Sequence, residues 1–419
     1  MKTRDLIIIG GGSAGMAAAI QAYNDGIKDI LIIEKDHKLG GILNQCIHNG
    51  FGLTEFKEEL TGPEYLTRFA NKISELGIEV KLDTTVLNIT KELVVTYSNR
   101  LDGYVNLKAK ALVLATGCYE RNAGAIQIPG DRPSGIITAG TAQKYLNIDG
   151  YLVGKRIVIL GSGDIGLIMA RRMTLEGAKV LCVAEIMPYS NGLNRNIAQC
   201  LNDFDIPLYL SHSVSKVVGN GRVEKVTISQ VDEKFQYIPG TEKEFECDTL
   251  LLSIGLIPNV GLLTDLNCPI GSTKGAIVNE NMETLIPGLF TCGNCLHVHD
   301  LVDFVSEEGR NAGHGAAMYI KNGEKVTRRV KVLNGENVGY VIPEIIDLDT
   351  KETTTFKFRV RKPIKDVYVI VESTQSTIKK VFKPVLIPSE MEMIKIPSDI
   401  INSLKDDIAI RIERRIIEK

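Results

Sequence analysis

A dense group of soft ligands, Cys292, Cys295, His297 and His299, lies within eight residues of sequence. Cysteine and histidine are the ligands that zinc prefers, and histidine is also the commonest proton-transfer group in proteins. A metal site normally takes its ligand pairs from separate loops, and four ligands in one short segment cannot easily surround a metal. We therefore predict no metal site here, and we keep His297 and His299 as candidate catalytic residues.

A second candidate for chemistry is Cys46, which His48 follows two residues later. A thiolate is a nucleophile that can be oxidised to a sulfenate, and a neighbouring histidine cation favours the thiolate. Residues two apart on a helix do not face one another, however, and an isolated cysteine often behaves as a small buried hydrophobic residue. Both interpretations stay open: Cys46 and His48 are candidate catalytic residues, or they belong to the packing.

The elements that must position these residues contain an internal repeat. The apolar run Leu6–Ile9 leads into GGGSAG, and the run Ile157–Leu160 leads into GSGDIG. In each copy a helix-like stretch follows, and an acid, Glu34 or Glu185, stands 24 residues after the first glycine. One Gly-x-Gly-x-x-Gly pattern is weak support for a binding site, but two copies between a strand and a helix are strong support.

Both turns have the features of a dinucleotide-binding site. The first glycine permits the tight turn, the second lets the backbone approach a pyrophosphate, and the third lets the helix pack closely on its strand. Amides at the helix N-terminus face the phosphates, and the acid accepts hydrogen bonds from ribose hydroxyls. The candidate contacts are Gly10, Gly12, Ser13, Ala14, Gly15, Glu34 and Lys35 in the first site, and Gly161, Gly163, Asp164, Ile165, Gly166 and Glu185 in the second.

The second turn carries a carboxylate, Asp164, close to where a pyrophosphate would lie. Like charges repel strongly at such short distances, so we expect Asp164 to point away or to pair with a cation such as Arg171 or Arg172. Glu185 has no adjacent arginine, which favours NADH over NADPH, because an arginine accommodates the 2′-phosphate. A structural adenine nucleotide and an empty site are the remaining alternatives.

The strands that follow each turn indicate how the two sites are joined. Lys110–Leu114 ends at Ala-Thr-Gly, Asp248–Ile254 ends at Gly255, and a later strand precedes the helix-like stretch Val302–Ile320. The first dinucleotide unit therefore resumes after the second. We predict an α/β fold of two Rossmann-like domains, the second inserted in the first, with a small C-terminal β-rich domain. The expected domains are 1–148 with 272–328, then 149–271, and finally 329–419.

From its first residue to about residue 325, the chain resembles the two-dinucleotide flavoproteins, the pyridine nucleotide-disulfide oxidoreductase superfamily. The matching segments are GGGSAG with its acid, ATG at 115–117, GSGDIG with its acid, SIGLIPN from Ser253 and TCGN from Thr291. The resemblance implies FAD in the first site and NAD(P)H in the second. It also implies a Gly-Asp pair at the flavin's ribityl chain, where this chain has Gly293 and Asn294. The remaining candidate cofactor contacts are Gly41, Val86, Ala115, Thr116, Gly117 and Gly255.

A closer resemblance is to the flavoprotein subunits of opine oxidase, hydrogen cyanide synthase, dye-linked proline dehydrogenase and heterotetrameric sarcosine oxidase. It lies in ATGCYER from Ala115, SGIITAGTAQ from Ser134 and HVHDLVDFVSEEGRNAG from His297. Such subunits usually work inside multi-subunit dehydrogenases, so the resemblance implies a partner redox subunit.

The resemblance also bears on the cysteines. A disulfide reductase of this architecture has a redox pair shortly after the Gly-Gly that follows the ribose acid, and those positions hold Leu43 and His48. We therefore do not expect disulfide reduction by that route. Cys292 stands where relatives have a small residue by the flavin, which favours packing or flavin lining. The helix expected at Val302–Ile320 should point its first backbone amides at the flavin. Asp300 and Asp303 are expected at N-cap positions of this helix.

Composition excludes some classes of partner. The 419 residues carry 49 Lys+Arg against 51 Asp+Glu, so the formal charge is −2 and no basic surplus exists to bind nucleic acid. The longest apolar runs stop far short of the roughly 20 residues that span a bilayer. The first residues lead directly into a strand, without room for a signal peptide. With eight cysteines in no framework spacing, these features predict a cytoplasmic protein with thiols instead of disulfides.

The sequence therefore predicts an FAD-dependent oxidoreductase that passes electrons between its flavin and NAD(H) or a partner redox protein. A small-molecule substrate is the other candidate partner, and we expect an oligomer or hetero-complex. Two alternatives stay open: a self-contained NADH oxidase or peroxidase that uses Cys46, and a structural nucleotide-binding subunit without substrate chemistry. Residues 331–419 alternate in strand fashion and hold no Cys or His, which favours a small β-sandwich for packing or docking.

Overall fold

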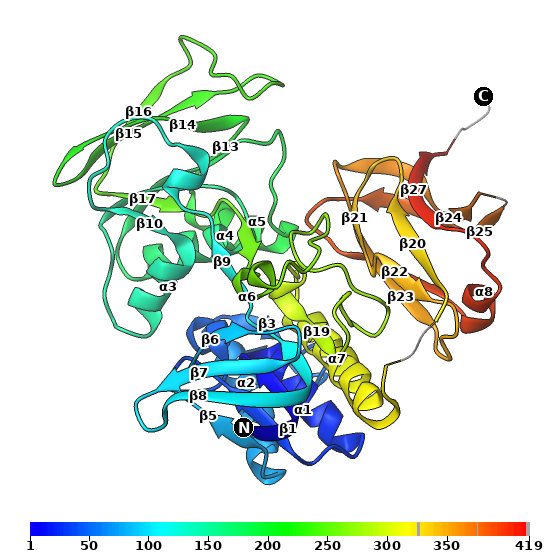
Figure 1. Ribbon diagram of the computed structural model, residues 1–419. Coiled ribbons are helices and arrows are strands. Elements are labelled where there is room, and N and C mark those ends of the chain that lie inside the picture. Colours follow the sequence, from blue (N-terminus) through cyan, green and yellow to red (C-terminus); the bar gives the residue numbers. More distant parts are fainter. Residues whose placement is uncertain (325–326, 375, 416–419) are drawn as a thin grey trace. The chain divides into compact units, whose positions relative to one another are not determined.

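The chain folds into two compact units, one inserted in the other (Figure 1). The first unit is Met1–Cys118 with Pro258–Lys419, and the second is Tyr119–Ile257. The computed structural model describes residues 1–324, 327–374 and 376–415, so positions 325–326, 375 and 416–419 of the expected domains lie outside the described residues. The exact domain boundaries expected from the sequence stay a prediction.

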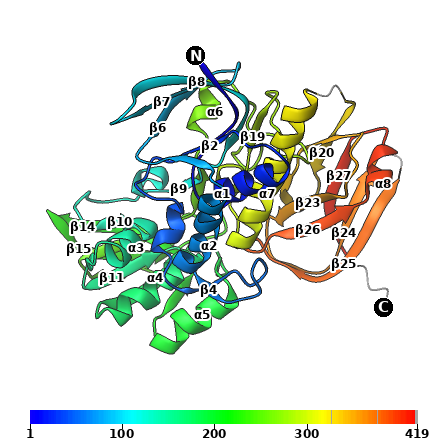
Figure 2. The same ribbon diagram turned by 90° about the horizontal axis from the view of Figure 1, so that it is seen from below.

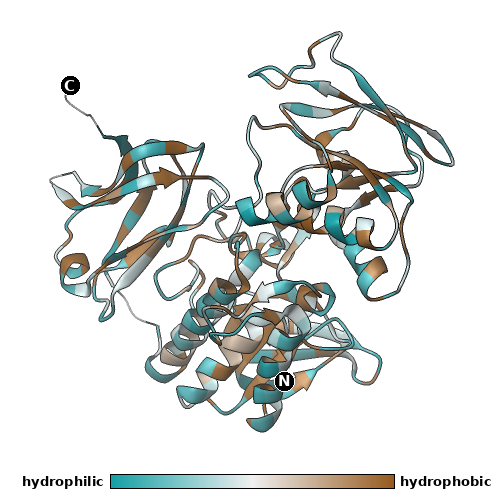
Figure 3. Ribbon diagram, turned by 180° about the vertical axis from the view of Figure 1, so that it is seen from behind, coloured by the Kyte–Doolittle hydropathy of each residue, from teal (hydrophilic) through white to brown (hydrophobic). Residues whose placement is uncertain are grey.

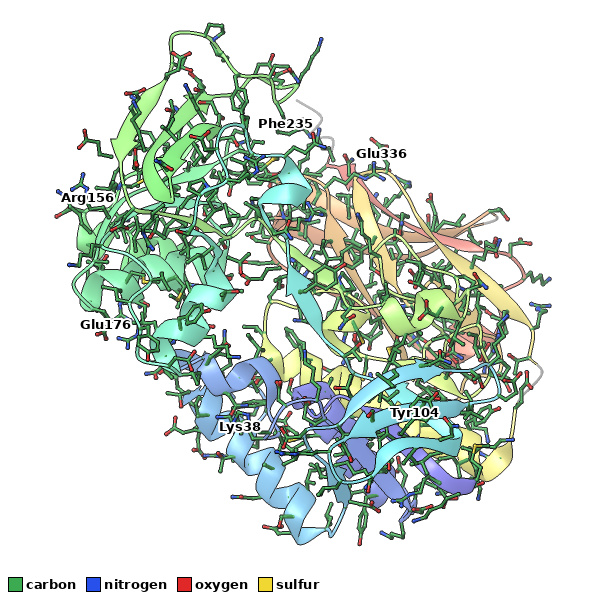
Figure 4. All side chains as sticks on the ribbon, turned by 60° about the vertical axis from the view of Figure 1, so that its left-hand side comes forward. Lys38, Tyr104, Arg156, Glu176, Phe235 and Glu336 are labelled. Atoms are coloured by element: carbon green, nitrogen blue, oxygen red, sulfur yellow. The ribbon has the colours of Figure 1, made fainter. Side chains whose placement is uncertain are left out.

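A mainly parallel sheet forms the centre of the first unit. Its strands are, in order, β5 (Glu79–Lys81), β2 (Ile30–Ile33), β1 (Lys2–Ile9), β8 (Gly103–Leu114), β7 (Val94–Asn99) and β6 (Thr85–Ile89), with β19 (Leu289–Thr291) paired to β8. Strand β8 is parallel to both β1 and β19, so the carboxyl ends of all three meet at one edge. The last four residues of β8 are buried, whereas Tyr104 near its start is 69% exposed (Figure 4).

Helices α1 (Ser13–Asn24) and α7 (Val302–Asn322) lie side by side and both contact β8 (Figures 1 and 2). Small residues make this close approach possible. A Cβ atom on Gly309 would lie 2.3 Å from the Ala14 backbone oxygen, and one on Gly313 would lie 2.2 Å from the Ala18 oxygen. Because each helix begins at a turn near the carboxyl edge of the sheet, this contact fixes the two turns relative to one another.

Helix α2 (Gly62–Glu75) follows a short hairpin of β3 (Asn49–Phe51) and β4 (Leu60–Thr61). Its start is set by a capping box, in which the Glu64 carboxylate accepts the Thr61 N–H at 2.8 Å and the Thr61 hydroxyl accepts the Glu64 N–H. The 3₁₀ turn Gly41–Gln45 precedes this hairpin.

The second unit contains another parallel sheet. Its strands are, in order, β10 (Ile136–Thr138), β17 (Thr249–Leu252), β11 (Arg156–Leu160), β12 (Lys179–Glu185) and β13 (Leu208–Leu210). Its helices are α3 (Ala139–Asn147), α4 (Asp164–Leu175) and α5 (Asn194–Cys200), and β14 (His212–Asn220), β15 (Arg222–Gln230) and β16 (Lys243–Glu246) form an antiparallel sheet. The chain leaves the first unit at β9 (Cys118–Glu120) and returns at β18 (Leu256–Pro258), followed by α6 (Gly261–Asp265).

The C-terminal part of the first unit is a β-sandwich with its own core, as predicted. One sheet is β22 (Ile345–Asp347), β20 (Arg329–Asn334), β27 (Ile408–Arg414), β24 (Ile364–Ser373) and β25 (Thr377–Leu386), and the other is β21 (Val338–Ile342), β23 (Thr354–Val360) and β26 (Glu392–Ile396). Apolar residues of both sheets, such as Phe356 and Ile410, form one buried cluster. Hydrophobic residues recur along the strands of the sandwich (Figure 3). Helix α8 (Ser398–Asn402) precedes β27. No described helix is long and apolar enough to cross a membrane.

The contact between α1 and α7 requires a glycine at position 313, and this requirement can be tested. Substitution Gly313→Val would push a branched side chain into the Ala18 backbone, and overpacking of this kind typically lowers the free energy of unfolding by about 1–3 kcal/mol. Urea denaturation of the two proteins measures the difference. Asn311→Ala on the exposed side of α7 is the control, with an expected change within about 0.5 kcal/mol. Equal stability of Gly313→Val and the parent would contradict the close packing.

Candidate active site

The first glycine-rich turn connects β1 to α1 and leaves open space beside its middle glycine. Gly10 has a φ of +106°, and a Cβ atom there would lie 2.3 Å from the Ala115 oxygen. A Cβ atom on Gly15 would lie 1.9 Å from the Gly10 oxygen, so both positions require glycine for packing. At Gly12, by contrast, a Cβ atom would meet nothing within 4 Å. The packing glycines therefore hold the turn, and Gly12 leaves room for a ligand.

The residues around this opening fit an FAD cradle. Gly41, with a φ of +52°, lies against Gly12, its hypothetical Cβ 3.6 Å from the Gly12 Cα. Gly117, with a φ of +68°, also has nothing within 4 Å of its hypothetical Cβ. Thr116 is fixed by a hydrogen bond from its hydroxyl to the Asn259 oxygen at 2.9 Å. Of the other candidates, Ser13 and Ala14 begin α1, Lys35 is exposed, and Val86 is half-buried on β6.

The two acids hold equivalent positions in the two turns. Glu34 is buried, and its carboxylate accepts the Gly11 N–H at 2.6 Å and the Asp36 N–H at 2.9 Å. Glu185 is also buried, and its carboxylate accepts the Ser162 N–H at 2.9 Å and the Met187 N–H at 2.9 Å. A carboxylate has about four acceptor positions, so each acid keeps capacity for ribose hydroxyls. The sequence repeat thus extends to matching hydrogen bonds.

The second turn repeats the steric logic of the first. Gly161 has a φ of +99°, and its hypothetical Cβ would lie 2.0 Å from the Ser253 oxygen. A Cβ atom on Gly166 would lie 2.7 Å from the Gly161 oxygen. A Cβ atom on Gly163 would have more room, because its nearest neighbour would be the Ser253 hydroxyl oxygen at 3.6 Å. Ile165 lies in the first turn of α4, and Gly255, with a φ of +100°, has open space beside it.

Asp164 is turned toward the segment that follows β12. Its carboxylate accepts the Leu193 N–H at 2.8 Å and an amide N–H of Asn196 at 2.6 Å. The suggested compensation by arginines is wrong for Arg172, which pairs with Glu176 and donates to Asn147 at 3.0 Å. The sequence could not show this, because Asp164 and Asn196 lie 32 positions apart.

A buried carboxylate on α7, Glu308, organises the histidine segment. One oxygen accepts the Gly293 N–H at 2.8 Å. The other lies 2.8 Å from Nε2 of His297, 3.2 Å from Nε2 of His299 and 3.3 Å from Nζ of Lys357. The Glu308 side chain is fully buried, and both imidazoles are 1% exposed. Four polar groups from two segments of the chain, 293–299 and β23, therefore converge on one carboxylate of α7.

The charges of this cluster are set by burial and by Lys357. Burial lowers the pKa of His297 to about 4, so its imidazole is neutral at pH 7. Burial alone would raise the pKa of Glu308, but the carboxylate's interactions with the two histidines and with Lys357 hold that pKa well below the usual range. The two histidines and Glu308 come within 4.8 Å of one another, close enough to hold a metal ion. The Lys357 ammonium beside the same oxygen already supplies a cation there, so we describe the group as an ionic hydrogen-bond cluster.

Asn294 connects this cluster to the first dinucleotide turn. Its side-chain oxygen accepts the backbone N–H of His299 at 3.1 Å and lies 3.3 Å from Nδ1 of the same histidine. Its side-chain nitrogen donates to Sγ of Cys118 at 3.6 Å. Gly293, just before it, lies against Ala14, because a Cβ atom there would be 2.9 Å from the Ala14 side chain. The histidine cluster therefore adjoins the cradle described above.

The two cysteines of this segment are fully buried. The Cys292 and Cys295 sulfurs lie 3.9 and 3.2 Å from the backbone oxygen of Leu114 at the end of β8. Burial raises the pKa of both thiols above the usual value, which keeps them protonated. Such a pair is not accessible to a disulfide substrate.

Cys46 and His48 lie between the 3₁₀ turn and β3. The Cys46 thiol donates to the Ile42 oxygen at 3.3 Å, and burial raises its pKa to about 12. The His48 ring lies 5.0 Å from the Phe51 ring. A thiol with so high a pKa is almost wholly protonated at neutral pH, which disfavours the nucleophilic role.

The expected N-caps of α7 are wrong. The residue at the N-cap is Leu301, and neither aspartate caps the helix. Asp303 instead accepts the backbone N–H groups of Gly52 at 3.1 Å and Thr54 at 2.7 Å. Asp300 pairs with Arg359 of the sandwich. Both acids hold segments that are remote in sequence, which local pattern cannot reveal.

Sequence reasoning also missed Glu308 and Lys357. Lys357 lies on β23 between Phe356 and Phe358, and all three are buried. The lysine between two phenylalanines was the one available signal. Neighbouring residues of a strand point to opposite faces, so Lys357 had to lie on the face opposite the phenylalanines. Glu308 carried no comparable signal, since glutamate is ordinary in a helix.

A family model for pyridine nucleotide-disulphide oxidoreductases matches residues 4–323. The chain belongs to this family. Membership confirms the predicted superfamily and fold class, and it supports an oxidoreductase that uses FAD and a nicotinamide coenzyme. The β-sandwich after residue 328 lies outside the match.

Individual relatives agree with this family. An NADH oxidase of Methanocaldococcus jannaschii is 28% identical over 333 residues, which cover 74% of this chain and 66% of that protein. The structure of thioredoxin reductase from T. acidophilum has a TM-score of 0.61 at 24% identity, with 76% of this chain and 98% of that chain covered. The structure of L-proline dehydrogenase from P. horikoshii has a TM-score of 0.52 at 19% identity, with 78% of this chain and 57% of that chain covered. These two structures share the fold.

The open space beside Gly12 leads to a test that separates folding from flavin binding. Gly12→Ala places a methyl group in that space without a clash inside the protein, so the apoprotein should keep its melting temperature. The methyl group should obstruct the approach of the pyrophosphate and weaken FAD binding by about tenfold, or roughly 1.4 kcal/mol. Thermal unfolding and flavin titration measure the two effects. Unchanged FAD affinity would contradict the assignment of this turn.

Proposed function

We propose that the protein is an NADH-dependent flavin oxidoreductase that passes electrons to an acceptor other than a disulfide. Bound FAD supplies the redox chemistry, accepting a hydride and releasing electrons. The chain's own residues bind and orient the two nucleotides. The first turn, with Glu34, Gly41 and Gly117, would hold FAD, and the second turn, with Glu185, would hold NADH.

The cysteines carry this proposal. Leu43 and His48 occupy the positions where a disulfide reductase of this architecture has its cysteine pair. The single Cys-x-x-Cys of the sequence, Cys292 and Cys295, has both thiols fully buried and donating to the end of β8. Among the described residues, neither these two positions nor the Cys292–Cys295 pair offers an accessible dithiol, which supports direct transfer from the flavin to its acceptor.

The choice of NADH follows from charge at the second site. The Glu185 carboxylate, fixed by two backbone N–H groups, would accept ribose hydroxyls and repel a 2′-phosphate. The segment 186–193 after β12 contains no Lys or Arg that could neutralise such a phosphate. The turned carboxylate of Asp164 removes the repulsion that a pyrophosphate would otherwise meet.

The acceptor that we favour is a partner redox protein. The sequence segments ATGCYER, SGIITAGTAQ and HVHDLVDFVSEEGRNAG resemble flavoprotein subunits of multi-subunit dehydrogenases. The shared fold with an L-proline dehydrogenase is compatible with this proposal. A small-molecule acceptor is the alternative.

Anaerobic titration tests the coenzyme assignment. NADH should bleach the yellow flavin, whereas NADPH should require about tenfold or more higher concentration, because a carboxylate faces its extra phosphate. Glu185→Gln should raise the KM for NADH about tenfold, since a charged acceptor is lost, and should narrow the preference over NADPH. The control is Glu233→Gln at an exposed position of the same unit. A flavin that neither coenzyme reduces would refute the proposal.

A second candidate is a self-contained NADH oxidase or peroxidase, which the similarity to the Methanocaldococcus jannaschii NADH oxidase favours. In that mechanism Cys46 would be oxidised to a sulfenate by peroxide. The high pKa of the Cys46 thiol opposes this reaction.

Substitution of Cys46 distinguishes the two candidates. We expect Cys46→Ser to keep the rate of NADH oxidation, with oxygen or an artificial acceptor, within about twofold of the parent, because the thiol is protonated. Stopped-flow kinetics with oxygen and with peroxide make the comparison. Loss of peroxide turnover in the variant, with flavin reduction by NADH intact, would favour the Cys46 mechanism instead.

A further inference from the structure

The imidazole of His299 lies between two oxygen atoms. Its Nδ1 is 3.3 Å from the side-chain oxygen of Asn294, and its Nε2 is 3.2 Å from a carboxylate oxygen of Glu308. A neutral imidazole carries one N–H and can donate through only one of its nitrogens. In the neutral form, therefore, one nitrogen lone pair faces an oxygen, and only the doubly protonated form satisfies both contacts.

The orientation of Asn294 is fixed by its other contacts. Its oxygen also accepts the backbone N–H of His299 at 3.1 Å, and its nitrogen donates to the sulfur of Cys118 at 3.6 Å. Exchange of the two amide atoms would place N–H against N–H at the His299 backbone. The amide therefore presents its oxygen to the ring, and the second acceptor for His299 is built into the fold.

The charges around His299 allow one further proton. Lys357 balances Glu308, and His297, the other ring on that carboxylate, is kept neutral by burial. On the far side of His297 the Tyr340 hydroxyl accepts from Arg359, which is itself paired with Asp300. With one proton on His299 the charges of this cluster would sum to zero, and a second proton would leave one positive charge.

An excess buried positive charge is stable when a negative charge forms close by. The cluster adjoins the FAD cradle, since Gly293 lies against Ala14 at the start of α1 and Cys118 follows the open Gly117. A flavin that receives a hydride gains two electrons and one proton, and so gains one negative charge. The charge that forms on the cofactor and the vacant proton position on His299 are therefore complementary.

We propose that His299 takes up a proton from solvent each time the flavin is reduced and releases it when the flavin is reoxidised. The inference rests on the flavin of the proposed function, though not on NADH as its reductant. Two electrons and one proton go to the flavin, and the second proton goes to a nitrogen of His299, so charge stays balanced. Glu308 and Lys357 are positioning residues that hold the ring and set its charge.

The pH dependence of the flavin midpoint potential tests the proposal, because it counts the protons taken up for every two electrons. The parent protein should take up two protons near neutral pH, and His299→Gln should take up one. Glutamine keeps a hydrogen-bonding side chain but cannot hold the extra charge. The matched control is His314→Gln, because the His314 ring lies on α7 and contacts the Asp25 carboxylate. This variant should still take up two protons for every two electrons. An unchanged count in His299→Gln would overturn the proposal.

A second measurement uses the parent protein alone, in case His299→Gln loses its flavin. The reduced-minus-oxidised infrared difference spectrum, recorded with and without isotope-labelled histidine, should contain a histidine band that changes on reduction. A spectrum without such a band would overturn the proposal. So would a stoichiometric transition metal in the parent that is lost in His299→Gln, because Nε2 would then be a ligand. A protein that holds no FAD would instead refute the proposed function.

Discussion

The buried carboxylate of Glu308 is the interaction on which the site depends. It accepts the Gly293 N–H and an N–H of Lys357, and it lies within hydrogen-bond distance of two histidine rings. It therefore joins α7, the turn after β19 and the sandwich. A buried ion is expensive unless it is paired and fully hydrogen-bonded, and Glu308 satisfies both conditions. Each neighbour is positioned because the charge must be satisfied. The charge of Glu308 therefore both sets the electrostatics of the cluster and holds the surrounding segments in place.

The rest of the site is built from a device that the chain uses twice. In each unit a strand leads into a glycine whose positive φ and close backbone neighbours exclude other residues, and a helix starts three residues later. An acid at the end of the next strand accepts a backbone N–H of the turn. The acid and the turn stabilise one another without a ligand. Each nucleotide would then meet a preorganised surface, which limits the entropy lost on binding.

Sequence reasoning was strongest where spacing alone determines geometry. The glycine turns with Glu34 and Glu185, the inserted second unit and the C-terminal sandwich follow from the sequence pattern, and the fold agrees with their placement. The nucleotide contacts of these residues stay a prediction. It failed where a side chain chooses a partner that is remote in sequence. Asp303 was expected to cap its own helix but binds backbone near Gly52, and Asp164 turns to Asn196. Polar side chains close to a helix start have several acceptable partners, and tertiary packing decides among them.

The ion pair between Lys357 and Glu308 also connects the C-terminal sandwich to the region that the family model matches. The family match ends at residue 323, yet the cation that balances a carboxylate inside the matched region comes from beyond it. Removing one partner of such a pair costs roughly 3–5 kcal/mol, against a total stability of roughly 5–15 kcal/mol for a typical domain. The sandwich therefore contributes to the stability of the region that the family model matches. A chain without the sandwich would leave the buried Glu308 carboxylate without this cation, so it would need a compensating change at Glu308.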